Sequence, residues 1–272
     1  MKTSFWKLSG AGNDFVTFDN RLEFIPESAK PELGRNLCRR GLSVGADGLM
    51  LLENSDRAHI RMRVFNGDGS EAETCGNASR CIALLALTIG AAPPDMSIET
   101  GAGIYRAEVT GNRVCISMTE PHDLRLDIPL SDPDIPAPVI HFVNTGVPHA
   151  VVFVDDVENL DITTLGRRLR HHHLFRPAGA NINFVQIVDN SRMIIRTYER
   201  GVEEETLACG TGCAAAAIIA GTLGEARNPV QLKTRGGFIN TIHFSILDSS
   251  ITDLKLEGEA RIVFRGEIEL EL

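Results

Sequence analysis

Two similar stretches of this chain begin with the dipeptide Cys-Gly: CGNASRCIALLA at residues 75–86 and CGTGCAAAAIIA at residues 209–220. Each passes directly from Cys-Gly into an apolar run of helical length. A helix that is apolar on all sides is normally a buried one. We therefore predict two buried helices that begin in the same way, separated by 209 − 75 = 134 residues.

Four further pairs of segments repeat in the same order, 133 to 136 residues apart. They are SIETGAGI and QLKTRGGF (97–104 and 231–238), MRVFN and IRTYE (62–66 and 195–199), GAGNDFVTFDN and GVPHAVVFVDD (10–20 and 146–156), and VGADGL and AGANIN (44–49 and 178–183). Recurrent strand-turn-helix patterns could produce any one match, but five in the same order indicate an internal duplication.

Apolar runs of strand length surround each Cys-Gly helix, and residues 27–40 and 162–173 have the pattern of outer amphipathic helices. The predicted strands are FVTFD, LMLLE, IRMRVF and YRAEV in the first half and HAVVFVD, NFVQIV, MIIRTY and IHFSIL in the second. The predicted fold is α/β, with two pseudo-symmetric domains, residues 1–120 and 121–272. In each, a mixed or antiparallel sheet would wrap around the central helix as a barrel-like layer. We place the boundary in the proline-rich residues 121–139, where no periodicity is evident.

The composition is that of a soluble globular protein, with 43% hydrophobic and 23% charged residues among 272. A net charge of −9 argues against a nucleic-acid partner. No apolar run is long enough for a membrane helix, and the N-terminus lacks the pattern of a signal peptide, so we expect a cytoplasmic protein that does not bind membranes. Six widely spread cysteines are expected to be thiols there.

Cys75 and Cys209 lie directly before the two predicted helices. The first N–H groups of a helix have no partners within it, and with the helix dipole they form a site for an anion. The same setting is expected to lower the pKa of an adjacent thiol. The residues that would present these N–H groups are Gly76, Asn77, Gly210 and Thr211.

A pseudo-twofold arrangement of the halves would bring both helix starts to one substrate carboxylate, with a sulfur on each side of its α-carbon. One thiolate could then remove the α-proton while the other thiol supplies a proton to the opposite face. The N–H groups would stabilise the carbanion. Free cysteine is commonly a buried packing residue, and we assign that role to the other four: Cys38, Cys81, Cys115 and Cys213.

Four motifs resemble the diaminopimelate epimerase family over nearly the whole chain. They are SGAGNDFV (9–16), FNGDGSEAETCGNASRC (65–81), GVPHAVVFVDD (146–156) and YERGVEEETLACGTGCAAA (198–216). The resemblance implies two barrel-like domains, no cofactor, no metal and a homodimer. It also implies interconversion of LL- and meso-2,6-diaminopimelate, a small amino-acid substrate on the route to lysine and peptidoglycan.

The resemblance also implies roles for individual residues. Cys75 and Cys209 correspond to the acid/base pair, and His149 and Glu199 to residues that tune the protonation of the thiols. Glu199 would also help to bind an ammonium group. The side chains that would hold the distal end of the substrate are Asn13, Asn66, Asn181 and Arg200.

Two positions depart from the family pattern, and both put the substrate range in question. Val147 stands where some members have an Asn that contacts the distal carboxylate, and Gly48 where certain members have a Gln. One alternative is therefore another two-cysteine racemase, acting on histidine or proline, which would keep the cysteines and change the distal contacts. The alternative from another class is a non-catalytic amino-acid-binding protein, which would not need matched cysteines.

Overall fold

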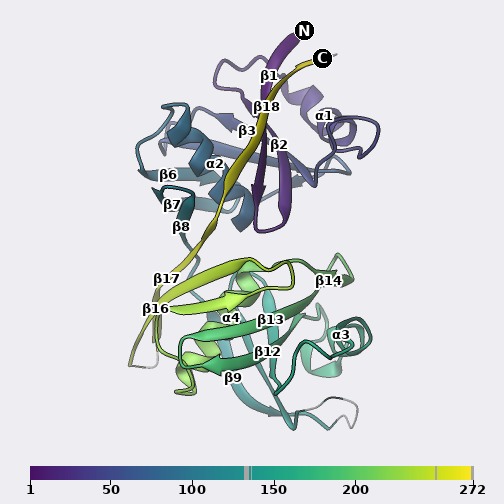
Figure 1. Cartoon of the computed structure of the whole chain (residues 1–272), viewed down its shortest axis with the longest axis vertical. Coiled ribbons are helices and arrows are strands. Elements are labelled where there is room, and N and C mark those ends of the chain that lie inside the picture. Colours follow the sequence, from purple (N-terminus) through teal and green to yellow (C-terminus); the bar gives the residue numbers. More distant parts are fainter. Residues whose placement is uncertain (132–134, 136, 249, 271–272) are drawn as a thin grey trace. The chain divides into compact units, whose positions relative to one another are not determined.

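The computed structural model describes residues 1–131, 135, 137–248 and 250–270 of the chain. It divides into two compact units. Unit 1 consists of Met1–Ile116 with Gly258–Leu272, and unit 2 of Ser117–Glu257. Figure 1 shows the elements of both. Of the helices in the described ranges, none is both long enough and apolar enough to cross a bilayer.

Unit 1 is a curled sheet with two helices and a short 3-10 turn (Glu27–Ala29). Its strands are β1 (Lys2–Gly10), β2 (Asn13–Asp19), β3 (Gly48–Glu53), β4 (Ile60–Asn66), β5 (Glu71–Ala72), β6 (Asp95–Thr100), β7 (Gly103–Thr110), β8 (Arg113–Ser117) and β18 (Arg261–Glu269); its helices are α1 (Lys30–Leu37) and α2 (Gly76–Thr88). The strands pair in the order β18–β1–β2–β3–β4–β6–β7–β8, with β5 also on β4. The β2–β3 and β4–β6 ladders are parallel and the others antiparallel.

Unit 2 repeats this plan. Its strands are β9 (His122–Pro129), β10 (Val139–Asn144), β11 (Pro148–Phe153), β12 (Asn181–Asp189), β13 (Arg192–Glu199), β14 (Glu204–Thr206), β15 (Val230–Lys233), β16 (Ile239–Leu247) and β17 (Ser250–Glu259); its helices are α3 (Ile162–Arg170) and α4 (Gly210–Thr222), with a 3-10 turn at His173–Phe175. The order is β9–β10–β11–β12–β13–β15–β16–β17, with β14 on β13. In both orders the third and the fifth ladders are parallel; in unit 2 these are β11–β12 and β13–β15. The predicted duplication is confirmed strand by strand.

The two predicted buried helices, α2 and α4, have the same length and lie 134 residues apart, since 210 − 76 = 134. α2 contacts β1, β2, β3, β4, β6, β7 and β18, and α4 contacts β10, β11, β12 and β16. Each sheet therefore wraps around its own helix as predicted. Between the described residues, no ladder joins the first strand of either order to the last, so the sheets are not closed by hydrogen bonds.

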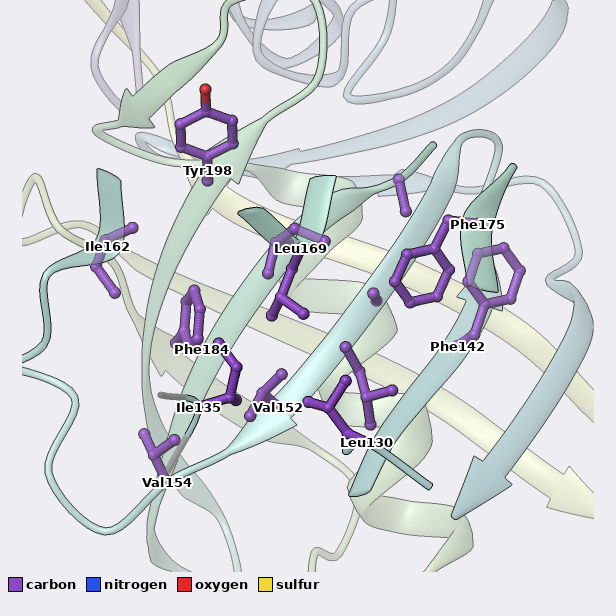
Figure 2. Packing of buried hydrophobic residues seen from close by; sticks show 14 of the residues in the cluster. Leu130, Ile135, Phe142, Val152, Val154, Ile162, Leu169, Phe175, Phe184 and Tyr198 are labelled. Atoms are coloured by element: carbon purple, nitrogen blue, oxygen red, sulfur yellow. The ribbon is translucent and has the colours of Figure 1, made fainter. Parts of the chain in front are cut away.

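A second core lies on the other side of each sheet, under the outer helix. In unit 2, Phe184 and Tyr198 pack with Ile162 and Leu169 of α3 (Figure 2). In unit 1, Leu33 and Leu37 of α1 belong to the corresponding cluster. Both sheets thus bury two faces, which explains why their central strands are continuously apolar.

Two expectations about the middle and end of the chain differ from the structure. Part of the expected linker is strand β9, which pairs with β10. Its sequence HDLRLDIP alternates between exposed and half-buried positions, and the polar residues and prolines hid that alternation. The last residues were expected in the second half, but β18 pairs with β1, so Gly258–Leu272 lies with unit 1.

Candidate active site

The two helix starts have the same local structure. Cys75 caps α2 and Cys209 caps α4, both in an extended backbone conformation and neither with a side-chain capping bond. The first intrahelical bonds are those from the Ser79 N–H to the Cys75 carbonyl and from the Cys213 N–H to the Cys209 carbonyl. The N–H groups of the residues between are therefore the ones that an α-helix leaves for an anion.

Strand ends gather around each helix start. In unit 1, Asn13 begins β2, and Gly48 at the start of β3 pairs with Asn66 at the end of β4. In unit 2, His149 of β11 lies beside Asn181 at the start of β12, and Glu199 ends the antiparallel β13. Two parallel strands followed by an antiparallel one bring these ends to one edge of the sheet. The topology explains why residues far apart in sequence become neighbours.

In unit 1 a chain of hydrogen bonds connects the helix start to the strand edge. The Asn77 side-chain amide donates to Asn13 Oδ1 over 2.6 Å, and Asn13 Nδ2 donates to Asp47 Oδ2 over 3.2 Å. The buried guanidinium of Arg80 donates to Asn77 Oδ1. On the outside, Arg40 donates to Asp47 Oδ1 over 2.8 Å. Asn13 and Asn77, two predicted site residues, are thus in direct contact.

In unit 2 the corresponding contact joins a histidine to a threonine. His149 Nε2 lies 2.9 Å from the Thr211 hydroxyl, which lies 3.4 Å from Cys209 Sγ. The Asn183 side chain contacts the other ring nitrogen, Nδ1, at 3.1 Å. The structure therefore brings His149, Thr211 and Cys209 together and adds Asn183.

The remaining predicted residues lie at or next to the same strand ends. Asn181 is buried, and its Oδ1 accepts the Arg200 N–H over 2.7 Å, so the two are neighbours. Asn66 donates through Nδ2 to the Ser70 hydroxyl over 3.0 Å in the turn after β4. Asn66 and Glu199 end equivalent strands, β4 and β13.

Burial determines the protonation of the unit 2 groups. It raises the pKa of the Cys209 thiol, and the nearby Glu199 carboxylate raises it further, while the Thr211 hydroxyl and the Gly212 N–H oppose this. The expected lowering by the helix start is thus wrong for Cys209. Burial also raises the pKa of Glu199. It lowers that of His149 to about 3, assisted by the positive charge of Arg200, so the imidazole is neutral.

Gly210, at the start of α4, lies close to a leucine side chain of β17. A Cβ atom at this position would lie 2.6 Å from Leu256 Cδ2. At Gly48, one of the two departures from the family pattern, a Cβ would lie 3.0 Å from the Phe65 carbonyl oxygen. A longer side chain at position 48 would need the backbone of β4 to shift.

Four residues that support the predicted ones, directly or through each other, were not predicted from the sequence: Asp47, Arg40, Asn183 and Thr197. The segment AGANIN carried a usable signal, because Asn183 is a polar residue inside an otherwise apolar buried strand. Cys81 and Cys213 are fully buried inside their helices, and burial raises the pKa of Cys81 to about 12. In the described part of the chain, no cluster of three or more His, Cys, Asp or Glu side chains could hold a metal ion.

Known proteins resemble this chain over most of its length. The family model described as diaminopimelate epimerase matches residues 5–124 and 141–248. The diaminopimelate epimerase of Aquifex aeolicus is 42% identical over 98% of both chains. That of Chlorobaculum tepidum is 40% identical over 97% of this chain and 100% of its own.

Solved structures share the fold at lower sequence identity. A PhzF-family phenazine biosynthesis protein from Bacillus anthracis has a TM-score of 0.74 at 15% identity, covering 99% of this chain and 100% of its own. A probable proline racemase from Agrobacterium radiobacter has a TM-score of 0.69 at 15% identity, covering 98% and 93%.

The chain is therefore an isomerase of the epimerase and racemase class, built on a duplicated two-unit fold. Within that class, it belongs to the diaminopimelate epimerase family.

Proposed function

We propose that this chain interconverts LL- and meso-2,6-diaminopimelate without a cofactor, with Cys75 and Cys209 acting on opposite faces of one α-carbon. The observation that carries the proposal is the repeated position of the two thiols. Each caps a buried central helix at the same point of its unit, in the same backbone conformation. A single buried cysteine would be unremarkable, whereas a matched pair beside two anion-binding helix starts suits proton transfer.

The reaction needs one thiolate and one thiol. The thiolate takes the α-proton, so that a C–H bond breaks, an S–H bond forms and the electron pair stays on the substrate. The thiol then gives its proton to the opposite face and becomes the thiolate. Burial and Glu199 raise the pKa of Cys209, which favours the thiol form of that side chain. We therefore propose that Cys75 is the thiolate that abstracts the first proton.

The helix starts would stabilise the carbanion. Negative charge that leaves the α-carbon spreads into the substrate carboxylate, where N–H donors of Gly76, Asn77, Gly210 and Thr211 would receive it. Such preorganised donors matter because they need no rearrangement as charge develops; the loss of one typically lowers the rate by about 10²–10³-fold. The helix starts then provide the electron sink that the reaction requires.

The distal end of the substrate carries a second ammonium and a second carboxylate. We assign the carboxylate to the Arg200 guanidinium, with amide contacts from Asn13, Asn66 and Asn181. Glu199 would bind the ammonium group. What supports this assignment is that Asn181 contacts Arg200 directly and that Asn13 contacts Asn77 at the helix start. The Val147 side chain offers no hydrogen bond, so the distal site relies on these residues.

The relatives are named diaminopimelate epimerases, a name that connects them to lysine biosynthesis. We propose that this chain has the same role. We also propose that it works in the cytoplasm and as a homodimer. Sedimentation of the purified chain at micromolar concentration tests the dimer. A species of about twice the 29.6 kDa chain mass is expected, and a monomer would contradict it.

Replacement of either cysteine tests the proposed chemistry. We expect Cys75→Ala and Cys209→Ala each to abolish epimerisation of LL-diaminopimelate, because each removes one of two essential proton carriers. The matched control is Cys115→Ala, which removes a half-buried thiol from β8 and should leave kcat unchanged. The assay should also include histidine and proline, on which no turnover is expected. Full activity in either of the first two variants would end the two-thiol proposal.

A further inference from the structure

A chain of buried polar side chains in unit 2 ends at the Cys209 sulfur. It begins at Thr197 of β13, whose hydroxyl donates to Asn183 Oδ1 over 3.0 Å. It continues from Asn183 Nδ2 to His149 Nδ1 at 3.1 Å, and from His149 Nε2 to the Thr211 hydroxyl at 2.9 Å. The Thr211 hydroxyl lies 3.4 Å from Cys209 Sγ. Every link lies within the one unit.

The direction of these hydrogen bonds follows from the Ala150 carbonyl. This group can only accept, and Asn183 Nδ2 lies 2.9 Å from it, so the nitrogen of the amide faces Ala150. The same nitrogen faces His149 Nδ1, and Thr197 donates to the amide oxygen. One N–H of Asn183 is therefore used by Ala150 and the other by His149. The His149 Nδ1 atom must accept, which leaves its ring proton on Nε2.

The proton on Nε2 determines what Thr211 can do. His149 donates it to the Thr211 oxygen, which leaves the hydroxyl proton of Thr211 free to point at Cys209 Sγ. Gly212 permits the arrangement, because a Cβ at that position would lie 2.3 Å from Asn183 Oδ1. We call this chain of hydrogen bonds the relay. In it, every donor points away from Thr197 and toward Cys209.

The other unit lacks this relay. By the offsets of the repeat, the counterpart of Asn183 is Leu49 and that of Thr197 is Val64, both buried. His149 and Thr211 are replaced by Asn13 and Asn77. Burying polar groups where apolar ones would pack is unfavourable unless each group is hydrogen-bonded. The difference between equivalent positions indicates that the polar pair serves Cys209 and not the fold.

We propose that Asn183 is a positioning residue, which holds His149 as the neutral Nε2–H tautomer and so directs the Thr211 hydroxyl proton to Cys209 Sγ. The step rests on the proposed function, in which Cys209 alternates between thiol and thiolate. While Cys209 is a thiol, its sulfur accepts from Thr211 and its own proton remains available for the substrate carbon. Once that proton has left, a donor already faces the thiolate, and no group has to turn.

The direct test is the tautomer of His149 in the wild-type protein, read by nitrogen NMR of ¹⁵N-histidine-labelled enzyme. His149 is identified by the signals lost in His149→Gln. His141 serves as a reference in the same spectrum, because its Nδ1 accepts the Asp127 N–H over 3.1 Å and its proton is therefore on Nε2. We expect His149 to show the same Nε2–H pattern. A proton on Nδ1, or an imidazolium at neutral pH, would overturn the proposal.

Two variants test whether Asn183 is responsible. Asn183→Asp places an acceptor beside Nδ1, so the ring proton should move to Nδ1 and Thr211 should turn toward Nε2. The double variant Asn183→Leu with Thr197→Val copies the packing of unit 1 and covers the case in which the first fails to fold. In each, we expect kcat to fall about 10- to 100-fold, with KM within about twofold, while the His141 signals stay unchanged. An unaltered His149 tautomer and kcat in either folded variant would contradict the assignment.

Thr211→Ser and Thr211→Val complete the design. The serine keeps the hydroxyl and should retain most of kcat, whereas the valine removes it and should lose activity to a similar extent as the Asn183 variants. Equal loss in both would show that the hydroxyl is not what matters. Because the tautomer is measured without substrate, an Nε2–H His149 in a protein that does not epimerise diaminopimelate would refute only the proposed function.

Discussion

His149 shows how one buried side chain connects stability to chemistry. The imidazole is fully buried, and its pKa of about 3 lies well below the ordinary value of 6.5. The folded protein therefore keeps it neutral over a pH range in which the unfolded chain binds a proton. Neutrality is also what the relay needs, because a doubly protonated ring would have no acceptor for Asn183.

The sign of the resulting pH dependence is fixed. Between pH 6.5 and 3 the unfolded state binds the extra proton, so the free energy of unfolding falls as the pH falls through that range. The slope approaches about 1.4 kcal/mol per pH unit. We expect wild type to lose about 2 kcal/mol more than His149→Gln between pH 6.5 and 4.5. Urea unfolding of both proteins at the two pH values measures this.

Equal losses in the two proteins would show that His149 does not remain neutral in the fold. Other groups also respond to acid, such as the buried His141, whose pKa is likewise lowered by burial. They are common to both proteins and cancel in the difference.

At the residue scale, the sequence pointed to the side chains at the two helix starts but not to the residues behind them. Cys75 and Cys209 were found because a repeat marks equivalent positions. Asn183 and Thr197 could not be found in this way, since their role depends on a departure from the repeat. The pKa of Cys209 was expected in the wrong direction, because a sequence reveals a helix start but not how deeply it is buried.

Among the elements, the outer helices repeat one packing detail. A glycine of each helix faces an aromatic residue of the central antiparallel strand: Gly34 of α1 faces Phe65, and Gly166 of α3 faces Tyr198. The approach is closer in unit 2. A Cβ at Gly166 would lie 2.4 Å from Tyr198 Cβ, whereas one at Gly34 would lie 3.1 Å from Phe65 Cβ.

Alanine at these two positions should therefore have different effects. Alanine favours a helix over glycine by up to about 1 kcal/mol, but overpacking a core lowers stability by about 1–3 kcal/mol. We expect Gly166→Ala to lower the free energy of unfolding by about 1–3 kcal/mol, and Gly34→Ala to change it by less than about 1 kcal/mol. Denaturant unfolding of the pair measures both. A Gly34→Ala variant that is the less stable of the two would refute the packing argument.

The sequence predicted the elements with the most regular apolar patterns. The eight expected strands lie in β2, β3, β4, β7, β11, β12, β13 and β16, and both outer helices are present. The strands that were missed include β9, β17 and β18, which are partly exposed and rich in charged residues. In such strands, pairing with a neighbour decides the conformation more than the apolar pattern does.

At the scale of the molecule, the last strand completes the first unit. β18 pairs with β1 along its length, and Arg265 lies over the ring of Trp6, 5.2 Å from its centroid. Sequence alone could not reveal this, because the partner strands stand at opposite ends of the chain. The repeat predicted two equal halves, and the chain instead returns to its starting unit.

Truncation after Ala260 should accordingly affect one unit first. Without β18, β1 loses an antiparallel partner and becomes an edge strand. We expect hydrogen-exchange mass spectrometry to show lost protection in peptides from β1, with little change in β12 and β13, whose partners all remain. The emission of Trp6, the one tryptophan of the chain, should also shift. Equal loss of protection in both units, or none in β1, would contradict this view of the fold.

The central claim is that two thiols work on one carbon, and the fate of the α-proton tests it most directly. LL-diaminopimelate is converted by wild-type enzyme in deuterated water, and both isomers are examined by mass spectrometry at low conversion. Two separate proton carriers predict that each new meso molecule carries deuterium at the inverted α-carbon, while the remaining LL substrate stays unlabelled. Meso product that retains the original proton, or label that enters both isomers equally from the start, would contradict the account.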